Sequence, residues 1–166
     1  MNNLYLTGIM GCGKSTAGKK AAKILKVLFF DVDHEVEKKE SMTISEIFNR
    51  RGEDAFREVE TRILSDLSAQ NGVMISTGGG IILRQKNVDR MKESGKIVWI
   101  RRPIETILES VNDRDRPLIK NNPQKLLRIY ADREPLYQKY ADFIVDNNGS
   151  LDDAAEAVVK IFMEYV

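Results

Sequence analysis

Residues 8–15 of this chain read GIMGCGKS and fit the pattern G-x-x-x-x-G-K-[ST] of a phosphate-binding loop. A short apolar run precedes the loop at residues 4–6, and a helical pattern begins at its end, which is the strand–loop–helix setting that such a loop needs. The glycines let backbone N–H groups surround an anion, and the positive end of the following helix adds to the attraction. A plain glycine-rich turn would not account for the Lys-Ser pair after the last glycine, so we expect the chain to bind a nucleoside triphosphate.

The end of this loop supplies the expected nucleotide and metal contacts. Lys14 would reach the β- and γ-phosphates, and the Ser15 hydroxyl would ligate Mg²⁺. Cys12 is the only cysteine and can form no internal disulfide, which suits a reducing compartment. Because Cys12 lies inside the loop, it could be read as a redox switch. We favour the interpretation that Cys12 is an ordinary loop residue, because the pattern accepts many residue types at this position. The residues expected to bind the nucleotide here are Gly11, Cys12, Gly13, Lys14, Ser15 and Thr16.

Alternating strand and helix patterns predict an α/β fold. Strand-like apolar runs lie at residues 4–6, 27–30, 73–75, 97–100 and 143–145. Right-handed crossovers between such strands produce a parallel sheet with helices on both faces, here with five strands. The helical patterns that separate or follow the strands cover residues 14–25, 33–40, 44–51, 55–70, 85–93, 104–111, 123–138 and 151–165.

Two carboxylates follow the second predicted strand, at the sheet edge where ligands bind in such folds. Asp31 and Asp33 would point the same way if the strand persisted. We expect Asp31 to serve the metal, through a water because Mg²⁺ keeps several of its own, and Asp33 to serve a substrate hydroxyl. Asp33 is also a good N-cap candidate for the next helix, and the two roles are compatible.

Further candidates follow the other strands. The triplet Gly78-Gly79-Gly80 leaves bare backbone that a ligand can approach. Residues between the second and third strands exceed what a crossover needs, and this insertion, about residues 33–60, offers Arg57 with Phe48 and Phe56. A charged segment around residues 112–122 resembles a lid, in which Arg116 would neutralise charge during transfer. Arg133 precedes a proline, and its planar fork suits a carboxylate.

The length and charge of the chain indicate one domain and no particular class of macromolecular partner. The 166 residues suit one domain, and 26 Lys and Arg against 25 Asp and Glu require no nucleic-acid or membrane partner. Met1 stands just before the first strand and no apolar run approaches spanning length, so we expect a soluble cytoplasmic protein without a leader, and a monomer. His34 is the only histidine, so no cluster of several histidines can bind a metal, and we expect His34 on the first helical turn after Asp33, partly exposed and without a catalytic role.

The ordered set of motifs resembles the shikimate kinase family over essentially the whole chain. These motifs are the phosphate loop, Asp-Val-Asp, Gly-Glu-Asp-Ala-Phe-Arg, Gly-Gly-Gly, Arg-Pro-Leu and Arg-Glu-Pro-Leu-Tyr. The resemblance implies a three-layer P-loop fold like that of nucleoside monophosphate kinases, in a single domain over residues 1–166. It also implies Mg²⁺- and ATP-dependent phosphorylation of the shikimate 3-hydroxyl, in the chorismate route to aromatic amino acids.

The same resemblance implies roles for individual residues. Asp33 would hold the attacking hydroxyl and serve as its base, Arg57 and Arg133 would clamp the shikimate carboxylate, Gly79 would offer its backbone N–H, and Arg116 would be the lid arginine. Two stretches depart from the family pattern: residues 108–111 lack an arginine near the expected adenine site, and residues 146–149 lack a basic residue. Arg114 is a possible substitute for adenine contacts.

Two alternatives stay open at the level of sequence. A kinase for another hydroxylated acid, such as gluconate, would share the loop and the fold but would not need Asp33 together with Arg57 and Arg133. A nucleotide-binding switch would need no small acceptor. Its GTPase form predicts an Asn-Lys-x-Asp motif, which the sequence lacks.

Overall fold

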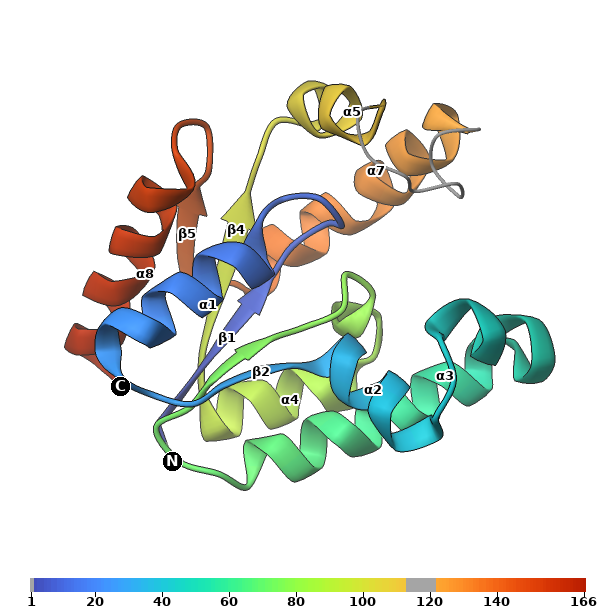
Figure 1. Ribbon diagram of the computed structural model, residues 1–166, viewed down its shortest axis with the longest axis horizontal. Coiled ribbons are helices and arrows are strands. Elements are labelled where there is room, and N and C mark those ends of the chain that lie inside the picture. The colour runs from blue at the N-terminus through green and yellow to red at the C-terminus, as the bar shows by residue number, and fades with distance from the viewer. Residues whose placement is uncertain (1, 113–121) are drawn as a thin grey trace.

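The structure is a computed structural model that describes residues 2–112 and 122–166. In this part of the chain, five parallel strands form one sheet in the order β2-β3-β1-β4-β5 (Figure 1). The five-stranded parallel sheet predicted from the sequence is confirmed. The strands are β1 (Asn3–Thr7), β2 (Phe29–Asp31), β3 (Met74–Ser76), β4 (Gly95–Arg101) and β5 (Phe143–Asp146).

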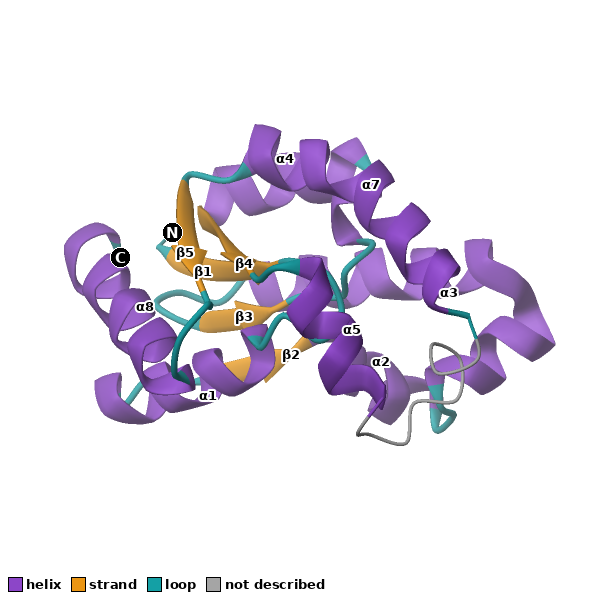
Figure 2. Ribbon diagram, turned by 90° about the horizontal axis from the view of Figure 1, so that it is seen from above, coloured by secondary structure: helices purple, strands orange, loops and turns teal. Residues whose placement is uncertain are grey.

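Helices cover both faces of the sheet and give the three layers expected of the fold (Figure 2). Helix α1 packs against α8 on one face, and α4 packs against both β4 and α3 on the other. The short 3₁₀ helix η1 (Ile81–Leu83) follows β3. The α-helices are α1 (Lys14–Leu25), α2 (Val32–Glu40), α3 (Ile44–Ser68), α4 (Gln85–Ser94), α5 (Ile104–Asn112), α7 (Pro123–Tyr140) and α8 (Leu151–Tyr165).

The central strand β1 is buried along its whole length, because the helical layers exclude water from both of its faces. Tyr5 points toward α3 and α4, where its hydroxyl donates to Ser68 Oγ at 2.8 Å and lies 2.6 Å from Ser94 Oγ. Parallel pairing aligns Leu6 of β1 and Asp31 of β2 with Ser76 of β3. The carboxyl ends of three strands therefore meet at one edge of the sheet, beside the start of the phosphate loop.

Helix α3 contains the two helices predicted at residues 44–51 and 55–70, which meet at a kink. The kink lies at Gly52, whose φ of 83° and ψ of 172° are not helical. A capping box starts α3: Thr43 Oγ1 accepts from the Glu46 amide, and the Glu46 carboxylate accepts from the Thr43 amide. The predicted insertion thus consists of α2 and a bent α3, which extends away from the sheet (Figure 1).

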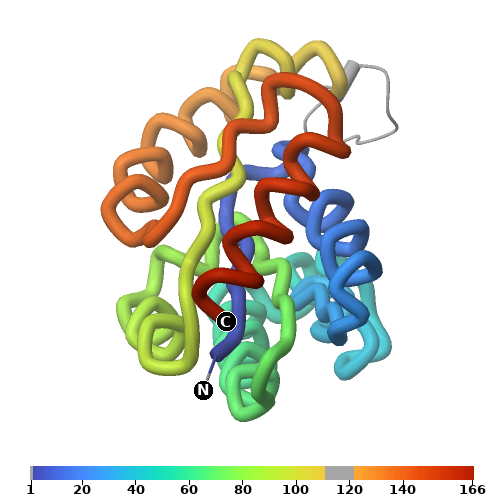
Figure 3. Tube along the Cα trace, turned by 90° about the vertical axis from the view of Figure 1, so that its left-hand side faces the viewer, coloured from blue at the N-terminus to red at the C-terminus, as the bar shows by residue number. Residues whose placement is uncertain are grey.

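The two ends of the described chain lie at the same end of the molecule, as the Cα trace shows (Figure 3). The Asn2 side chain donates to the Val166 carbonyl at 3.1 Å, which joins the first strand to the end of α8. No helix among residues 2–112 and 122–166 is both long and apolar enough to span a membrane.

Candidate active site

The phosphate loop joins β1 to α1 in the predicted strand–loop–helix arrangement. Its three glycines all have positive φ, of 144° at Gly8, 80° at Gly11 and 92° at Gly13, a backbone conformation that other residues rarely adopt. Lys14 begins α1, and its Nζ donates to the Ile9 carbonyl at 3.3 Å. The ammonium group thus lies over the loop, where it would meet a bound phosphate.

Three oxygen-bearing side chains meet next to the end of this loop: those of Ser15, Asp31 and Ser76. Ser15 Oγ donates to Asp31 Oδ2 at 2.6 Å and lies 2.9 Å from Ser76 Oγ. They come from α1 and from the ends of β2 and β3, which the strand register brings side by side. Ser15 and Asp31 were predicted from the sequence, whereas Ser76 was not, although it also ends a buried strand.

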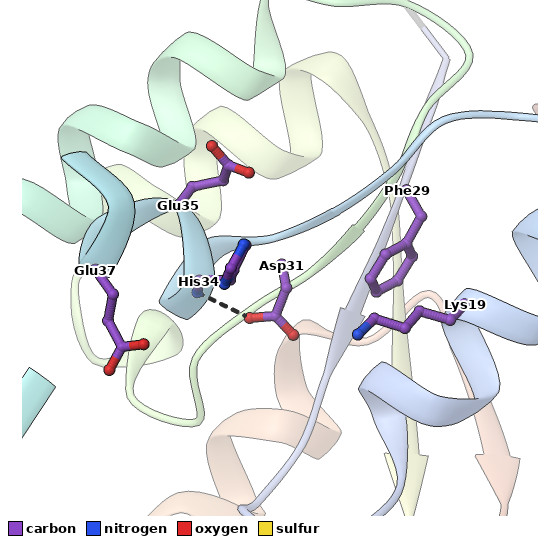
Figure 4. A pocket seen from close by; sticks show the side chains of 6 residues that line it. All are labelled: Lys19, Phe29, Asp31, His34, Glu35 and Glu37. Atoms are coloured by element: carbon purple, nitrogen blue, oxygen red, sulfur yellow. Dashed lines mark hydrogen bonds between the residues drawn. The ribbon is translucent and has the colours of Figure 1, made fainter. Parts of the chain in front are cut away.

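Asp31, and not Asp33, caps helix α2, so the expectation that Asp33 is the N-cap was wrong. The second oxygen of Asp31 accepts from the Asp33 amide at 3.1 Å and from the His34 amide at 3.3 Å (Figure 4). The strand ends at Asp31 and the helix starts one residue later, so the strand alternation assumed for the two carboxylates does not persist. The Asp31 carboxylate is therefore held between Ser15 and the α2 N-terminus.

A surface pocket lies on the outer side of Asp31, between α1 and α2. Lys19 of α1 approaches it from one side, and the acidic residues of α2 line the other (Figure 4). The pocket is lined by Lys19, Phe29, Asp31, His34, Glu35 and Glu37. His34 is exposed here, as expected for the first turn of α2.

Asp33 lies in the first turn of α2, half-buried and close to the glycine triplet. A Cβ atom on Gly78 would lie 2.7 Å from both Asp33 Oδ1 and Glu60 Oε1, so only glycine lets the backbone pass between these carboxylates. Burial raises the pKa of Asp33, an effect that the nearby charge of Lys14 opposes. Asp33 therefore lies within electrostatic reach of the phosphate loop.

Arg57 is buried in α3 and already paired with carboxylates of its own helix. Its Nη1 donates to Glu60 Oε2 at 2.8 Å, and its Nη2 donates to Glu53 Oε1 at 3.3 Å. Arg57 is 8% exposed and Glu60 is fully buried. Within the described residues, Arg57 Nε and Glu60 Oε1 form no hydrogen bond, so the pair keeps polar atoms for a ligand. Glu60, which lies about one helical turn after Arg57, was not among the residues predicted from the sequence.

A pair of aromatic side chains lies beside this arginine. The Phe48 and Phe56 rings lie 4.9 Å apart between centroids, and the Arg57 guanidinium lies 5.0 Å from the Phe56 ring centroid. The kink at Gly52 brings residues from its two sides into this contact. The predicted apolar walls beside Arg57 are therefore adjacent to each other.

Helix α7 brings Arg133 to the glycine triplet from the opposite side. A Cβ atom on Gly79 would lie 3.3 Å from Arg133 Nη1 and 3.3 Å from the Gly8 carbonyl oxygen, so the triplet separates Arg133 from the phosphate loop by little more than one backbone thickness. Tyr137, one turn further along, donates to the Gly79 carbonyl at 2.6 Å. Tyr137 ends the Arg-Glu-Pro-Leu-Tyr motif, but no role was predicted for it from the sequence.

The fold thus gathers most of the predicted site residues at the carboxyl edge of the sheet. Thr16 is exposed on α1 next to Ser15. Arg116 and Arg114, with most of the predicted lid at residues 112–122, lie outside the described residues. The predicted residues brought to this edge are Lys14, Ser15, Asp31, Asp33, Arg57, Gly79 and Arg133.

A parallel five-stranded sheet, a glycine-rich loop ending in Lys-Ser, and a second group of arginines and a carboxylate beside it define a P-loop kinase that acts on a small molecule. A family model described as shikimate kinase matches residues 10–164. A shikimate kinase of Clostridium botulinum (strain Alaska E43 / Type E3) is 38% identical over 162 residues, which cover 98% of each chain. This chain belongs to the shikimate kinase family.

Solved structures agree with this assignment. A shikimate kinase from Acinetobacter baumannii, solved in complex with shikimate, is 36% identical with a TM-score of 0.89, covering 99% of this chain and 94% of that one. A gluconokinase from Sinorhizobium meliloti is 13% identical with a TM-score of 0.62, covering 98% of this chain and 92% of that one. At that identity the second likeness shows the shared fold alone.

Proposed function

We propose that this chain transfers the γ-phosphoryl group of ATP to the 3-hydroxyl of shikimate, giving shikimate 3-phosphate and ADP in the chorismate pathway to aromatic amino acids. The observation that carries the proposal is that Asp33 lies against the glycine triplet, within electrostatic reach of both the phosphate-loop Lys14 and the buried Arg57, in a member of the shikimate kinase family. A phosphate donor and a carboxylate-bearing acceptor would meet at Asp33.

The acceptor side of the site suits a small anionic polyol. Arg57 and Arg133 lie on different helices and would bind the shikimate carboxylate through their planar guanidinium groups. Gly79 would donate its backbone N–H to the substrate, and the Phe48–Phe56 pair would pack against the ring. The Acinetobacter baumannii relative was solved with shikimate bound, which supports this choice of acceptor.

Asp33 would orient the attacking hydroxyl and accept its proton as the bond to phosphorus forms. Burial raises the pKa of Asp33, which makes its carboxylate a stronger base than an exposed aspartate. Lys14 would neutralise charge on the transferred group, and phosphoryl transfer requires little more than such positioning and neutralisation. Arg116 stays the predicted lid arginine in this proposal.

Ser15 and Asp31 would hold Mg²⁺, Asp31 through a water. The hydroxyl and carboxylate oxygens that converge here are the hard ligands that Mg²⁺ prefers, so the residues present fit the ion. Mg²⁺ held there would supply positive charge that offsets the negative charge of the phosphates. Asp31 also holds the N-terminus of α2, so the residue that serves the metal also sets the position of Asp33.

We further propose that the enzyme acts as a monomer in the cytoplasm, with ATP and shikimate as its partners and without nucleic acid or membrane. Dependence on ATP supports this location, as does a single cysteine that can form no internal disulfide. The nearly balanced charge supports the absence of a nucleic-acid partner.

The first test measures ADP release by the purified protein with Mg-ATP and one of three acceptors, shikimate, quinate or gluconate, or none. We expect release that depends on shikimate. The control is Lys14→Ala, which should lose turnover while its thermal unfolding stays close to wild type. Release only with gluconate would favour the alternative kinase, and tight nucleotide binding without acceptor-dependent release would favour a nucleotide switch.

A further inference from the structure

The three carbonyl groups of the glycine triplet are all held by hydrogen bonds. The Gly78 carbonyl accepts from the Ile81 amide at 3.2 Å, and the Gly80 carbonyl accepts from the Leu83 amide at 3.1 Å. Both bonds belong to the local 3₁₀ turn. The Gly79 carbonyl instead accepts from the Tyr137 hydroxyl, 58 residues further along the chain, in the shortest of the three bonds at 2.6 Å.

The hydroxyl of Tyr137 is held in a fixed place because the core encloses its ring. Tyr137 is fully buried and stacks on Trp99 of β4, with 5.9 Å between ring centroids and 22° between ring planes. Trp99 is itself 2% exposed and belongs to a seven-residue strand. The hydrogen bond to Gly79 therefore ties the glycine triplet to the rigid sheet.

This bond also sets where the glycine N–H groups point. A peptide group is planar, so a fixed Gly79 carbonyl fixes the Gly80 N–H at the other end of the same peptide. Glycine without such a tie has more backbone freedom than any other residue. Within residues 2–112 and 122–166, the amides of Gly78, Gly79 and Gly80 donate to no other residue, so they are available to a ligand.

The same helix face carries a predicted substrate ligand. Arg133 precedes Tyr137 by four residues, so the two side chains lie one above the other on α7. A Cβ atom on Gly79 would lie 3.3 Å from both Arg133 Nη1 and Tyr137 Oη. One hydrogen bond thus sets the spacing between the Arg133 guanidinium and the glycine amides.

We propose that Tyr137 is a positioning residue for acceptor binding: its hydroxyl holds the Gly79 carbonyl so that the glycine amides and Arg133 present their N–H groups to shikimate in one geometry. The inference rests on the proposed function for the identity of the acceptor. The Tyr137 hydroxyl donates its single proton to the Gly79 carbonyl, so Tyr137 acts through that backbone group and not as a donor to either substrate.

The test is Tyr137→Phe, which keeps the ring on Trp99 and removes only the hydroxyl. We expect the shikimate KM, and the shikimate Kd measured by titration calorimetry without nucleotide, to rise about three- to tenfold, the loss expected for one neutral hydrogen bond. The ATP KM should stay within about twofold of wild type. This split between substrates is a result that a general loss of stability would not produce.

Tyr5→Phe is the matched control. Tyr5 is also fully buried, and its hydroxyl bonds Ser68 and Ser94, away from the glycine triplet. It should lower thermal stability without changing the shikimate KM. The proposal is overturned if Tyr137→Phe leaves the shikimate KM unchanged, raises both KM values equally, or lacks a cooperative melting transition. If the wild-type enzyme itself shows no shikimate-dependent turnover, the proposed function fails first and the inference falls with it.

Discussion

At the scale of single residues, the buried pair of Arg57 and Glu60 shows how this site balances charge before a ligand arrives. A buried guanidinium without a partner would be strongly destabilising, and Glu60 supplies that partner at 2.8 Å. The bond uses one edge of Arg57 and leaves other N–H groups for a carboxylate. Glu60 therefore stabilises the arginine in the free enzyme without occupying all of its donors.

Glu60 should make stability depend on pH. Burial raises the pKa of Glu60, and Asp33 adds to the effect, although Arg57 and Arg133 oppose it. Because the folded state then binds more protons than the unfolded state, the contribution of Glu60 to the unfolding free energy falls as pH rises between the two pKa values. Glu60→Gln removes this titration while keeping the shape of the side chain.

We expect the unfolding free energy of wild type, minus that of Glu60→Gln, to decrease as pH rises above the unfolded pKa of about 4.3 and to level off above the folded value. Urea denaturation of both proteins across this range measures the difference. The exposed Glu93→Gln, on α4, serves as the control for removing a carboxylate. A difference that stays constant or increases with pH would contradict the raised pKa.

Arg133 should act on the acceptor and not on the nucleotide. If Arg133 binds the substrate carboxylate as proposed, Arg133→Ala removes a charge-assisted contact, and we expect the shikimate KM to rise about ten- to hundredfold, or kcat to fall comparably. Steady-state kinetics with each substrate varied in turn would measure this. Lys139→Ala, which removes an exposed positive charge from the same helix, should change neither KM. An effect of Arg133→Ala confined to ATP would rule out the carboxylate role.

At the scale of elements, helix α3 obtains its shape from one glycine. Residues before Gly52 carry Phe48 and residues after it carry Phe56 and Arg57, so the kink decides how these groups face each other. The backbone of Gly52, at φ 83° and ψ 172°, lies in a region that is essentially restricted to glycine. A straight helix would carry the Phe48 side chain away from the acceptor side.

Gly52→Ala should therefore lower both stability and acceptor affinity. Nothing lies within 4 Å of a Cβ atom at this position, so the expected loss of about 1–3 kcal/mol in unfolding free energy comes from backbone conformation and not from a clash. Urea denaturation and the shikimate KM are the measurements. Asp54→Ala, at an exposed position two residues further on, should leave both unchanged. If Gly52→Ala is as stable as wild type, the backbone conformation at residue 52 does not require glycine, which would contradict this prediction.

At the scale of the whole molecule, a residue near the C-terminal end of the chain supports the phosphate loop near the N-terminal end. Asn147, in the loop between β5 and α8, is 4% exposed, and its Nδ2 donates to the Cys12 carbonyl at 2.8 Å, 135 residues away. The backbone N–H of Asn147 donates to the Arg101 carbonyl at the end of β4 at 2.8 Å. The loop that follows the last strand therefore supports the loop that follows the first strand.

Asn147→Ala should weaken nucleotide binding more than acceptor binding. Without the amide, the Cys12 carbonyl loses its partner and the loop gains freedom, so we expect the ATP KM to rise about three- to tenfold. The shikimate KM should change less than twofold, in about the pattern opposite to that of Tyr137→Phe. Asn148→Ala, at the exposed neighbouring position, is the control. Equal effects on both substrates would point to general loosening of the fold.

Most of the fold and many residues of the site were predictable, because their signals are local. The phosphate loop is a contiguous pattern, and α1 and α8 have the predicted bounds because apolar periodicity and terminal residues mark helices well. The parallel sheet follows from alternating strands and helices. The roles of Asp33, Arg57, Gly79 and Arg133 came from the ordered motifs of a family, and they stay predictions until the variants are measured.

The sequence alone determined which residue types stand after each strand, and hence predicted a phosphate-binding site at the carboxyl edge of a parallel sheet. Only the tertiary structure decided that Asp31 caps α2, that Glu60 pairs with Arg57, and that Tyr137 and Asn147 hold distant backbone carbonyls. The last two contacts join positions 58 and 135 residues apart. Such partners are chosen by how elements pack against one another, which no local pattern of residues encodes.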